Sequence, residues 1–112
     1  MLIERNVPVV MVISYITLVE MLLVRARENP GQAAFTVGEH TFTFGAVWQA
    51  VNRFATCLLH HHLNRGDRVV LALPNGPEFF FAFYGVQRAG GTAVPVYPES
   101  GPERVFGMAR LC

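Results

Sequence analysis

Two short apolar runs flank a helix-length segment in the second half of the chain. The first run covers Val69 to Leu73, the helical segment covers Glu78 to Ala89, and the second run covers Thr92 to Val96. A strand, a helix and a strand within about thirty residues have the size of a βαβ unit. Both runs are rich in β-branched residues and apolar on both faces, which is typical of parallel strands covered by helices on each side. The pattern therefore predicts an α/β fold with parallel strands.

The ends of the helical segment carry the expected start and stop residues. Pro77 fits the first helical position, and Glu78 places a carboxylate at the positive end of the helix dipole. Gly90 or Gly91 is suited to the left-handed conformation just past the helix end. The segment itself is apolar on almost every side, through Phe79, Phe80, Phe81, Phe83 and Tyr84. Such a helix needs protein around it on several sides, which indicates a layered domain larger than this chain.

The first half of the chain predicts a capped helix. Thr17-Leu18-Val19-Glu20 is a capping box, T-x-x-E, and Asn29-Pro30-Gly31 ends the helix that follows. Four apolar residues recur at helical spacing and form its expected core face: Val19, Leu22, Leu23 and Ala26.

A β-hairpin and a second helix are expected next. Ala34 to Val37 and Thr41 to Phe44 alternate around Gly38-Glu39, a pair typical of a type II′ turn. Phe44 also fits the start of the next helix, with Thr43 as its N-cap and an end near His62. The core stripe of that helix is Val47, Val51, Phe54 and Leu58.

The composition excludes some classes of function but does not identify the function. The chain has 112 residues, which predicts one domain, and a net charge of +1, which gives no sign of a nucleic-acid partner. The apolar fraction is 52% and the charged fraction only 15%, again as in a piece of a larger core. Cys57 is predicted to be a buried small hydrophobe, and with Cys112 it does not form a secreted disulfide framework.

Residues 1–16 form a leader of uncertain structure, and residues 17–112 form the predicted domain. Val7 to Val24 resembles a membrane span, but Pro8 and Glu20 interrupt it and its length is the bare minimum for spanning. The leader lacks the cleavage site of a signal peptide. We therefore expect a cytoplasmic protein, and keep membrane association through residues 7–24 as an alternative.

Three short motifs suggest chemistry that their geometry does not favour. His60-His61-His62 cannot converge on one metal ion from a helix, because consecutive residues point about 100° apart. Arg65-Gly66-Asp67 fits a tight turn into a strand better than an adhesion motif. Pro74-Asn75-Gly76 lies at the carboxyl end of a predicted strand, where α/β folds bind ligands, but turn chemistry alone explains its residues.

The last segment predicts a helix that begins at Pro102, with Ser100 or Gly101 as its cap. Val105, Met108 and Ala109 are expected to face inward. The sequence stops at Cys112 inside this helix, and we therefore expect the chain to be truncated.

In this order the motifs resemble those of a known superfamily. Thr17 to Phe35 resembles "T-L-V-E-L-L…R-A…N-P…A-F", Phe42 to Ala55 resembles "L-T-Y-x-E-L…N-R-L-A", and Gly66 to Phe79 resembles "G-D-R-V-A-L-L-L-P-N-S-P-E-F". Ala89 to Pro98 resembles "K-A-G-A-V-Y-V-P-L-D-P", and Pro102-Glu103-Arg104 resembles the start of "P-A-E-R-L". The chain is thus similar to the N-terminal part of adenylate-forming (AMP-binding) ligases, the superfamily of acyl-CoA synthetases, fatty-acyl-AMP ligases and peptide-synthetase adenylation domains.

The departures from the family pattern are informative. Ala46 stands where the family usually has Glu, so that half of a capping box is missing. Tyr97 stands where many members have Asp, and V-P-V-Y-P from Val94 to Pro98 is more similar to the fatty-acyl-AMP ligase branch. Residues 1–16 match no part of the family.

The resemblance implies an ATP-dependent ligase of a carboxylic acid, with a fatty acid as the expected substrate. The acid attacks ATP with the help of Mg²⁺ to form an acyl-adenylate, and the acyl group then passes to the thiol of CoA or of an acyl carrier protein. This chemistry needs a phosphate-binding loop with a lysine, but the chain contains no lysine and no G-x-x-x-x-G-K-[ST] loop. We therefore expect an inactive N-terminal scaffold with no catalytic, cofactor-binding or metal-binding residue. The alternative is a non-catalytic interaction module derived from the family.

Overall fold

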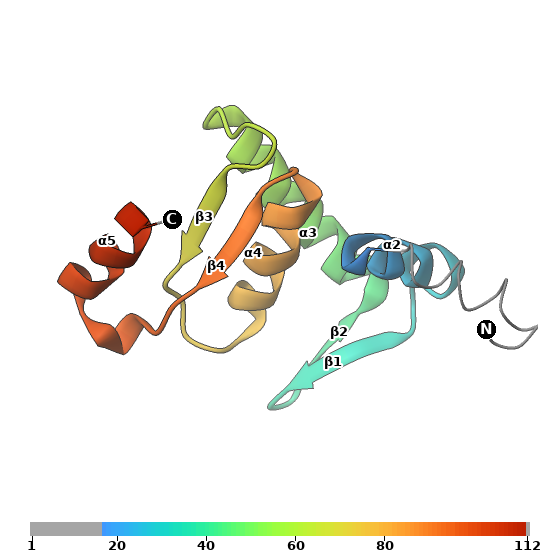
Figure 1. Ribbon diagram of the computed structural model, residues 1–112. Helices are drawn as coiled ribbons and strands as arrows, with labels where there is room; N and C mark the ends of the chain where they lie inside the picture. The colour runs from blue at the N-terminus through green and yellow to red at the C-terminus, as the bar shows by residue number, and fades with distance from the viewer. Residues whose placement is uncertain (1–16, 112) are drawn as a thin grey trace, which may run out of the picture.

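The computed structural model describes residues 17–111. The predicted leader, residues 1–16, and Cys112 lie outside the described residues. Figure 1 shows a β-hairpin on one side of two packed helices and a parallel strand pair on the other. The elements, in chain order, are α2 (Leu18–Glu28), β1 (Ala33–Val37), β2 (His40–Thr43), α3 (Phe44–His60), β3 (Arg68–Leu71), α4 (Pro77–Arg88), β4 (Thr92–Pro95), the 3₁₀ turn η1 (Pro98–Ser100) and α5 (Pro102–Leu111).

The predicted α/β architecture is confirmed. β3 and β4 pair in parallel, with Arg68 opposite Thr92 and Leu71 opposite Pro95, and α4 connects them. Both strands end earlier than the apolar runs in the sequence. Pro95 has no N–H to donate, and the last bond between the two segments runs from the Val96 N–H to the Leu71 carbonyl oxygen at 3.0 Å. The pairing thus extends one residue past Pro95, and the missing N–H of this proline does not end it.

The hairpin is the second sheet. β1 and β2 pair antiparallel, and Val37 lies opposite His40, which leaves Gly38 and Glu39 as the two turn residues. Gly38 has φ of 61°, the positive value that a type II′ turn needs at its first central position. Phe35 of the hairpin stacks on Phe42, with ring centroids 5.1 Å apart, and its ring also lies 4.9 Å from that of Phe80 in α4. These rings attach the hairpin to the helices.

Helix α4 joins two hydrophobic clusters. Leu22, Val47 and Val51 are the buried centre of the first cluster, on the hairpin side, and α4 adds Phe80, Phe81 and Tyr84 to it. Leu71, Ala82 and Val86 are the buried centre of the second cluster, on the strand side. The all-round apolar character of α4 thus has a direct cause, because protein covers it on two sides.

Helices α3 and α4 approach each other closely at Gly85. A Cβ placed on Gly85 would lie 2.7 Å from Cδ1 and 2.9 Å from Cβ of Phe54. One turn further along, Arg88 Nε donates to Asn52 Oδ1 at 3.1 Å, and the Arg88 guanidinium lies 5.4 Å from the centre of the Trp48 ring. The glycine sets the distance between the helices, and the arginine contact connects their exposed side.

The helix starts follow the predicted capping residues. Thr17 and Glu20 form both bonds of a capping box at α2. Thr43 caps α3 by accepting a bond from the Ala46 N–H at 3.1 Å, and α3 begins at Phe44, so this residue belongs to the helix rather than to the strand. Ala46 has no side chain that could return the second bond of the box.

The inward face predicted for the last helix is largely wrong. α5 buries no residue; Val105 is half-buried, whereas Met108 and Ala109 are exposed. Among the described elements α5 contacts η1 and β3. Helical periodicity marks an apolar stripe correctly, but a stripe becomes buried only where another element faces it.

The close helix contact predicts the effect of one added methyl group. Gly85→Ala should lower the free energy of unfolding by about 1–2 kcal/mol, because overpacking against Phe54 outweighs the gain in helix propensity. Gly107→Ala in α5 is the matched control, since nothing lies within 4 Å of its Cβ position, and it should stabilise by about 0.5–1 kcal/mol. Urea unfolding measures both. A Gly85→Ala protein with the same free energy of unfolding as the unsubstituted protein would contradict the close approach of α3 and α4.

The incomplete capping box predicts a stabilising substitution. Ala46→Glu should raise the free energy of unfolding by about 0.5–1 kcal/mol, because its carboxylate can accept a bond from the backbone N–H of Thr43 and lies at the positive end of the α3 dipole. Ala46→Gln offers the same bond without the charge and should gain less. Thermal unfolding of the unsubstituted protein and of the two variants measures the effect. Equal midpoint temperatures for all three would refute the expected stabilisation.

Candidate functional site

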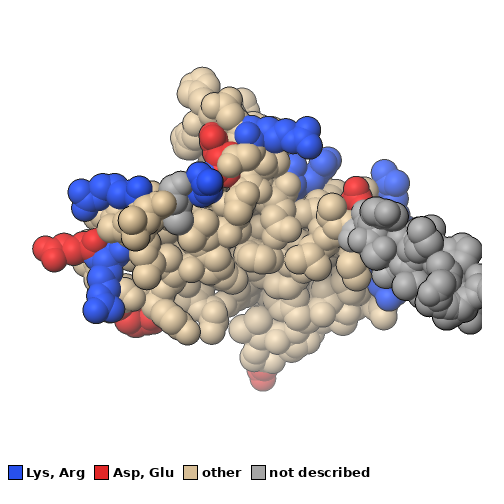
Figure 2. All heavy atoms as spheres, in the orientation of Figure 1, with Lys and Arg blue, Asp and Glu red and all other residues tan. Residues whose placement is uncertain are grey.

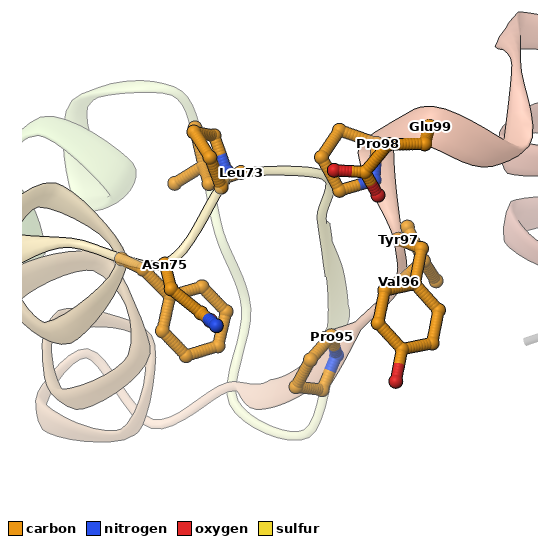
Figure 3. A pocket seen from close by; sticks show the side chains of 9 residues that line it. Leu73, Asn75, Pro95, Val96, Tyr97, Pro98 and Glu99 are labelled. Atoms are coloured by element: carbon orange, nitrogen blue, oxygen red, sulfur yellow. The ribbon is translucent and has the colours of Figure 1, made fainter.

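The carboxyl ends of β3 and β4 border a hollow, which we call the carboxyl-edge hollow. Its volume is about 420 Å³, within the roughly 300–1,000 Å³ usual for ligand pockets. Figure 3 shows two walls that face each other across it. The wall that follows β3 is Leu73, Pro74, Asn75 and Phe79, and the wall that follows β4 is Pro95, Val96, Tyr97, Pro98 and Glu99.

The hollow exists because the two strands separate at this edge. Beyond the bond between Val96 and Leu71, the β3 chain turns through Pro74 toward α4, and the β4 chain turns into η1 at Pro98. Prolines limit both segments to extended or turn conformations without a donor for a continued ladder. The proline positions in the sequence thus determine where pairing ends and the hollow begins.

Helix α4 starts beside the hollow, but its start is not an anion site. Gly76 is its N-cap and provides no side-chain bond, and Pro77 provides no N–H. Glu78 lies in the first turn, and its Oε1 would be 3.5 Å from a Cβ on Gly76. The helix therefore carries its own carboxylate at the positive end of its dipole.

The lining of the hollow is mostly apolar, with three polar side chains. Asn75 contributes an amide, Tyr97 a phenol and Glu99 a carboxylate, and Tyr97 is 79% exposed. No arginine lines the hollow, and the chain has no lysine. Phosphate groups need cationic or N–H-rich surroundings, so the residues of this hollow do not fit the triphosphate of ATP.

The described residues do not fit a metal centre either. Within residues 17–111, no group of three or more His, Cys, Asp or Glu side chains is placed to hold an ion. His60 is the last residue of α3, His61 is its C-cap, and His62 has φ of 65°, so the triplet forms the end of the helix. Mg²⁺ is therefore not assigned to any of residues 17–111.

Arg65-Gly66-Asp67 forms the predicted turn into β3. Gly66 has φ of 87°, and its N–H donates to the Gly90 carbonyl oxygen at 2.8 Å. Asp67 Oδ2 accepts a bond from the Asn64 N–H at 2.8 Å. These local bonds explain the glycine and the aspartate by turn geometry.

Cys57 was expected in the core, and this is wrong: the thiol is exposed. The buried face of α3 carries Val47, Val51 and Ala55. Position 57 lies two residues after Ala55, about 200° further round the helix, and therefore on the opposite side. The apolar preference of cysteine does not outweigh its place on the helix.

Charge and hydropathy of the described residues add two observations. On the face seen in Figure 2, the arginines and carboxylates lie toward the margins, and a broad uncharged surface lies between them. From residue 17 to residue 111, none of the helices is long and apolar enough to cross a membrane. The part of the apolar run 7–24 that the structure describes belongs mostly to α2, where Leu22 is buried in the first cluster.

Comparison with known proteins identifies the family. The model of the family described as "AMP-binding enzyme" matches residues 22–112. The chain belongs to the AMP-binding enzyme family.

Curated relatives within this family are far longer than the chain. A PKS-NRPS hybrid synthetase of Aspergillus niger is 45% identical over 84 residues, which are 75% of this chain and 4% of the relative. A long-chain-fatty-acid–CoA ligase of Haemophilus influenzae is 33% identical over 92 residues, 81% of this chain and 16% of the relative. The chain thus spans a small part of the AMP-binding enzymes that it matches.

Solved structures confirm the fold of this part. The fatty acid AMP ligase of Legionella pneumophila superimposes with a TM-score of 0.75 at 28% identity, covering 88% of this chain and 18% of that chain. A nonribosomal peptide synthetase in its AMPPNP-bound form gives a TM-score of 0.80 at 25% identity, covering 86% and 10%. The resemblance seen in the motifs is therefore confirmed in three dimensions.

Sequence reasoning found one wall of the hollow and missed the other. Pro74-Asn75-Gly76 was placed at a ligand-facing edge but explained as a turn, and the structure places Pro74 and Asn75 in the wall of the hollow. Tyr97 and Glu99 were not connected with this edge. The available signal was the parallel pairing itself, which brings the ends of both strands to one edge of the sheet.

The exposure of Cys57 predicts its reactivity. In a Cys112→Ser background, one thiol should react with Ellman's reagent within minutes in the folded protein, at a rate close to that of the urea-unfolded chain, because access controls the reaction. Absorbance of the released thiolate measures it. The double variant Cys57→Ser, Cys112→Ser is the control, and a rate at least about a hundredfold slower in the folded state would show a buried thiol.

Proposed function

We propose that this chain is the N-terminal scaffold of an ATP-dependent carboxylate ligase, and that residues 17–112 form the first part of its AMP-binding domain. In the whole ligase a carboxylate attacks the α-phosphate of ATP, forms an acyl-adenylate and releases pyrophosphate. The thiol of CoA or of a carrier protein then takes the acyl group and AMP leaves. We place this reaction in the cytoplasm.

The observation that carries the proposal is the family match over residues 22–112. The similar fold of a fatty acid AMP ligase and of a nonribosomal peptide synthetase supports it. The chain has no lysine to bind phosphate, and its hollow does not fit a triphosphate. ATP and Mg²⁺ would therefore be held by other parts of the ligase, and residues 17–112 would support them without catalysing a step alone.

A fatty acid is the substrate that we propose. The segment V-P-V-Y-P, from Val94 to Pro98, resembles the fatty-acyl-AMP ligase branch, and the Legionella pneumophila structure superimposes over 88% of this chain. An amino acid is the second candidate, because the Aspergillus niger relative with 45% identity is a PKS-NRPS hybrid synthetase.

A different class of function is a non-catalytic interaction module. The observation that favours it is the exposed apolar surface of α5, where Phe106 is 64%, Met108 42% and Leu111 89% exposed. The same surface is also expected where a scaffold meets the remainder of its own domain. The two functions differ in whether the chain can support adenylation.

A chimera tests the scaffold directly. Residues 17–112 replace the equivalent segment of the Legionella pneumophila fatty acid AMP ligase, and acid-dependent ATP–pyrophosphate exchange is measured with fatty acids and amino acids. The chimera should retain exchange within roughly a hundredfold of the intact enzyme, since the scaffold supplies no reacting group. The isolated chain should show none.

The control is the same chimera with Val51→Asp, which places a charge in the first cluster and should abolish folding and exchange together. A chimera that folds, as shown by its circular dichroism and cooperative unfolding, but lacks exchange with every acid would contradict the scaffold. Exchange by the isolated chain would contradict its assignment as an inactive part.

A further inference from the structure

We propose that a groove beside the start of α2 is the docking site for the leader of the same chain, residues 1–16. We call it the α2–β4 groove, and its lining is Leu18, Phe83, Gln87, Gly91, Thr92 and Ala93. The family match begins at residue 22, so the leader and Leu18 both lie outside it. The inference therefore concerns a contact that the family match does not include, and it does not depend on the proposed ligase function.

Three segments form the α2–β4 groove. Leu18 comes from α2, Phe83 and Gln87 come from α4, and the remaining residues come from the start of β4. The volume of the groove is about 360 Å³. Leu18 is 50% exposed, so half of this apolar wall is not covered by the described residues. The groove thus has room for apolar side chains from another segment.

One edge of β4 has no partner strand within residues 17–111, where β4 pairs with β3 alone. The N–H groups of Thr92 and Val96 donate to carbonyl oxygens on the β3 side, at 2.8 Å and 3.0 Å. Because alternate residues of a strand direct their N–H groups to opposite edges, the Ala93 N–H is directed to the free edge, and Pro95 has none. A peptide segment in the groove can therefore accept a bond from Ala93.

The leader has the composition and the attachment point that this surface needs. Residues 7–16 are all apolar except Pro8 and Ser14, and most are valine or isoleucine, which are enriched in strands. The leader joins α2 at Thr17, directly before the Leu18 wall of the groove. Ten extended residues reach up to about 35 Å, whereas the four residues of β4 span about 13 Å. The leader is therefore long enough to follow the whole free edge.

Other occupants fit the surroundings of the groove less well. Helices that lie in a membrane surface have an excess of basic residues on the polar face, but α2 exposes two acidic and two basic residues: Glu20, Arg25, Arg27 and Glu28. A leader from a second copy would compete with a tethered leader whose effective concentration is on the order of millimolar. The remainder of a longer ligase would continue from α5, and Figure 1 shows α2 and α5 at opposite ends of the molecule.

Hydrogen exchange of the 112-residue protein, followed by NMR, tests the occupant. The Ala93 amide should exchange at least about tenfold more slowly than in Ile13→Asp, because a charge in the leader opposes its docking on an apolar surface. Ser14→Asp is the matched control, since it adds the same charge at a polar position, and Ala93 should stay protected. The Thr92 and Val96 amides, which bond on the β3 side, should be unchanged in both variants.

A change in the groove wall tests the same contact from the other side. Leu18→Asp should remove the protection of the Ala93 amide, while a carboxylate in the first turn of α2 is favourable with the helix dipole and keeps the helix folded. Met21→Asp is the matched control, because Met21 is 49% exposed on the same helix but does not line the groove. It should leave the Ala93 amide protected.

Four outcomes would overturn the proposal. The first is an equal exchange rate of the Ala93 amide in the unsubstituted protein and in Ile13→Asp. The second is faster exchange at Thr92 and Val96 together with Ala93, which would mean that the leader stabilises the whole fold rather than this groove. Protection that rises with protein concentration would assign the groove to a second copy, and protection that requires phosphatidylglycerol vesicles would assign it to a lipid surface.

Discussion

The contact between α3 and α4 is the interaction on which the rest of the structure depends. Gly85 lets Phe54 lie against the backbone of α4, and the helices lie close enough for Arg88 to bond Asn52 and cover Trp48. Because α4 has apolar residues on two sides, this one contact joins the hairpin cluster to the strand cluster. The carboxyl-edge hollow is a second result of the same arrangement, since α4 begins at one of its walls.

Much of the fold could be predicted from local sequence signals. The capping threonines, the Gly38 turn and the βαβ spacing each depend on a few neighbouring residues, and all three are confirmed. The errors have a different origin. The burial of Cys57 and of the α5 stripe depends on which element faces a helix, and periodicity alone does not determine that.

The site was harder to predict than the fold because its two walls are separated in the chain by α4. Pro74 and Asn75 carry a recognisable turn pattern, whereas Tyr97 and Glu99 become neighbours of that turn only through parallel pairing. The family motifs placed the chain within the AMP-binding enzymes, but they contained no sign of the hollow. The chemistry of the hollow depends on the side chains just beyond the ends of β3 and β4. One of them is Tyr97, where the family pattern often has Asp.

The short loops between the packed elements have a consequence for biosynthesis. α3, β3, α4 and β4 follow one another within residues 44–95, so the contacts of the second cluster all lie within one continuous stretch of chain. The entropy cost of closing a loop grows only slowly with its length, and a ribosome adds only about 5–20 residues per second. We expect this unit to fold vectorially as it leaves the exit tunnel, and so to give whatever is synthesised after it a surface on which to assemble.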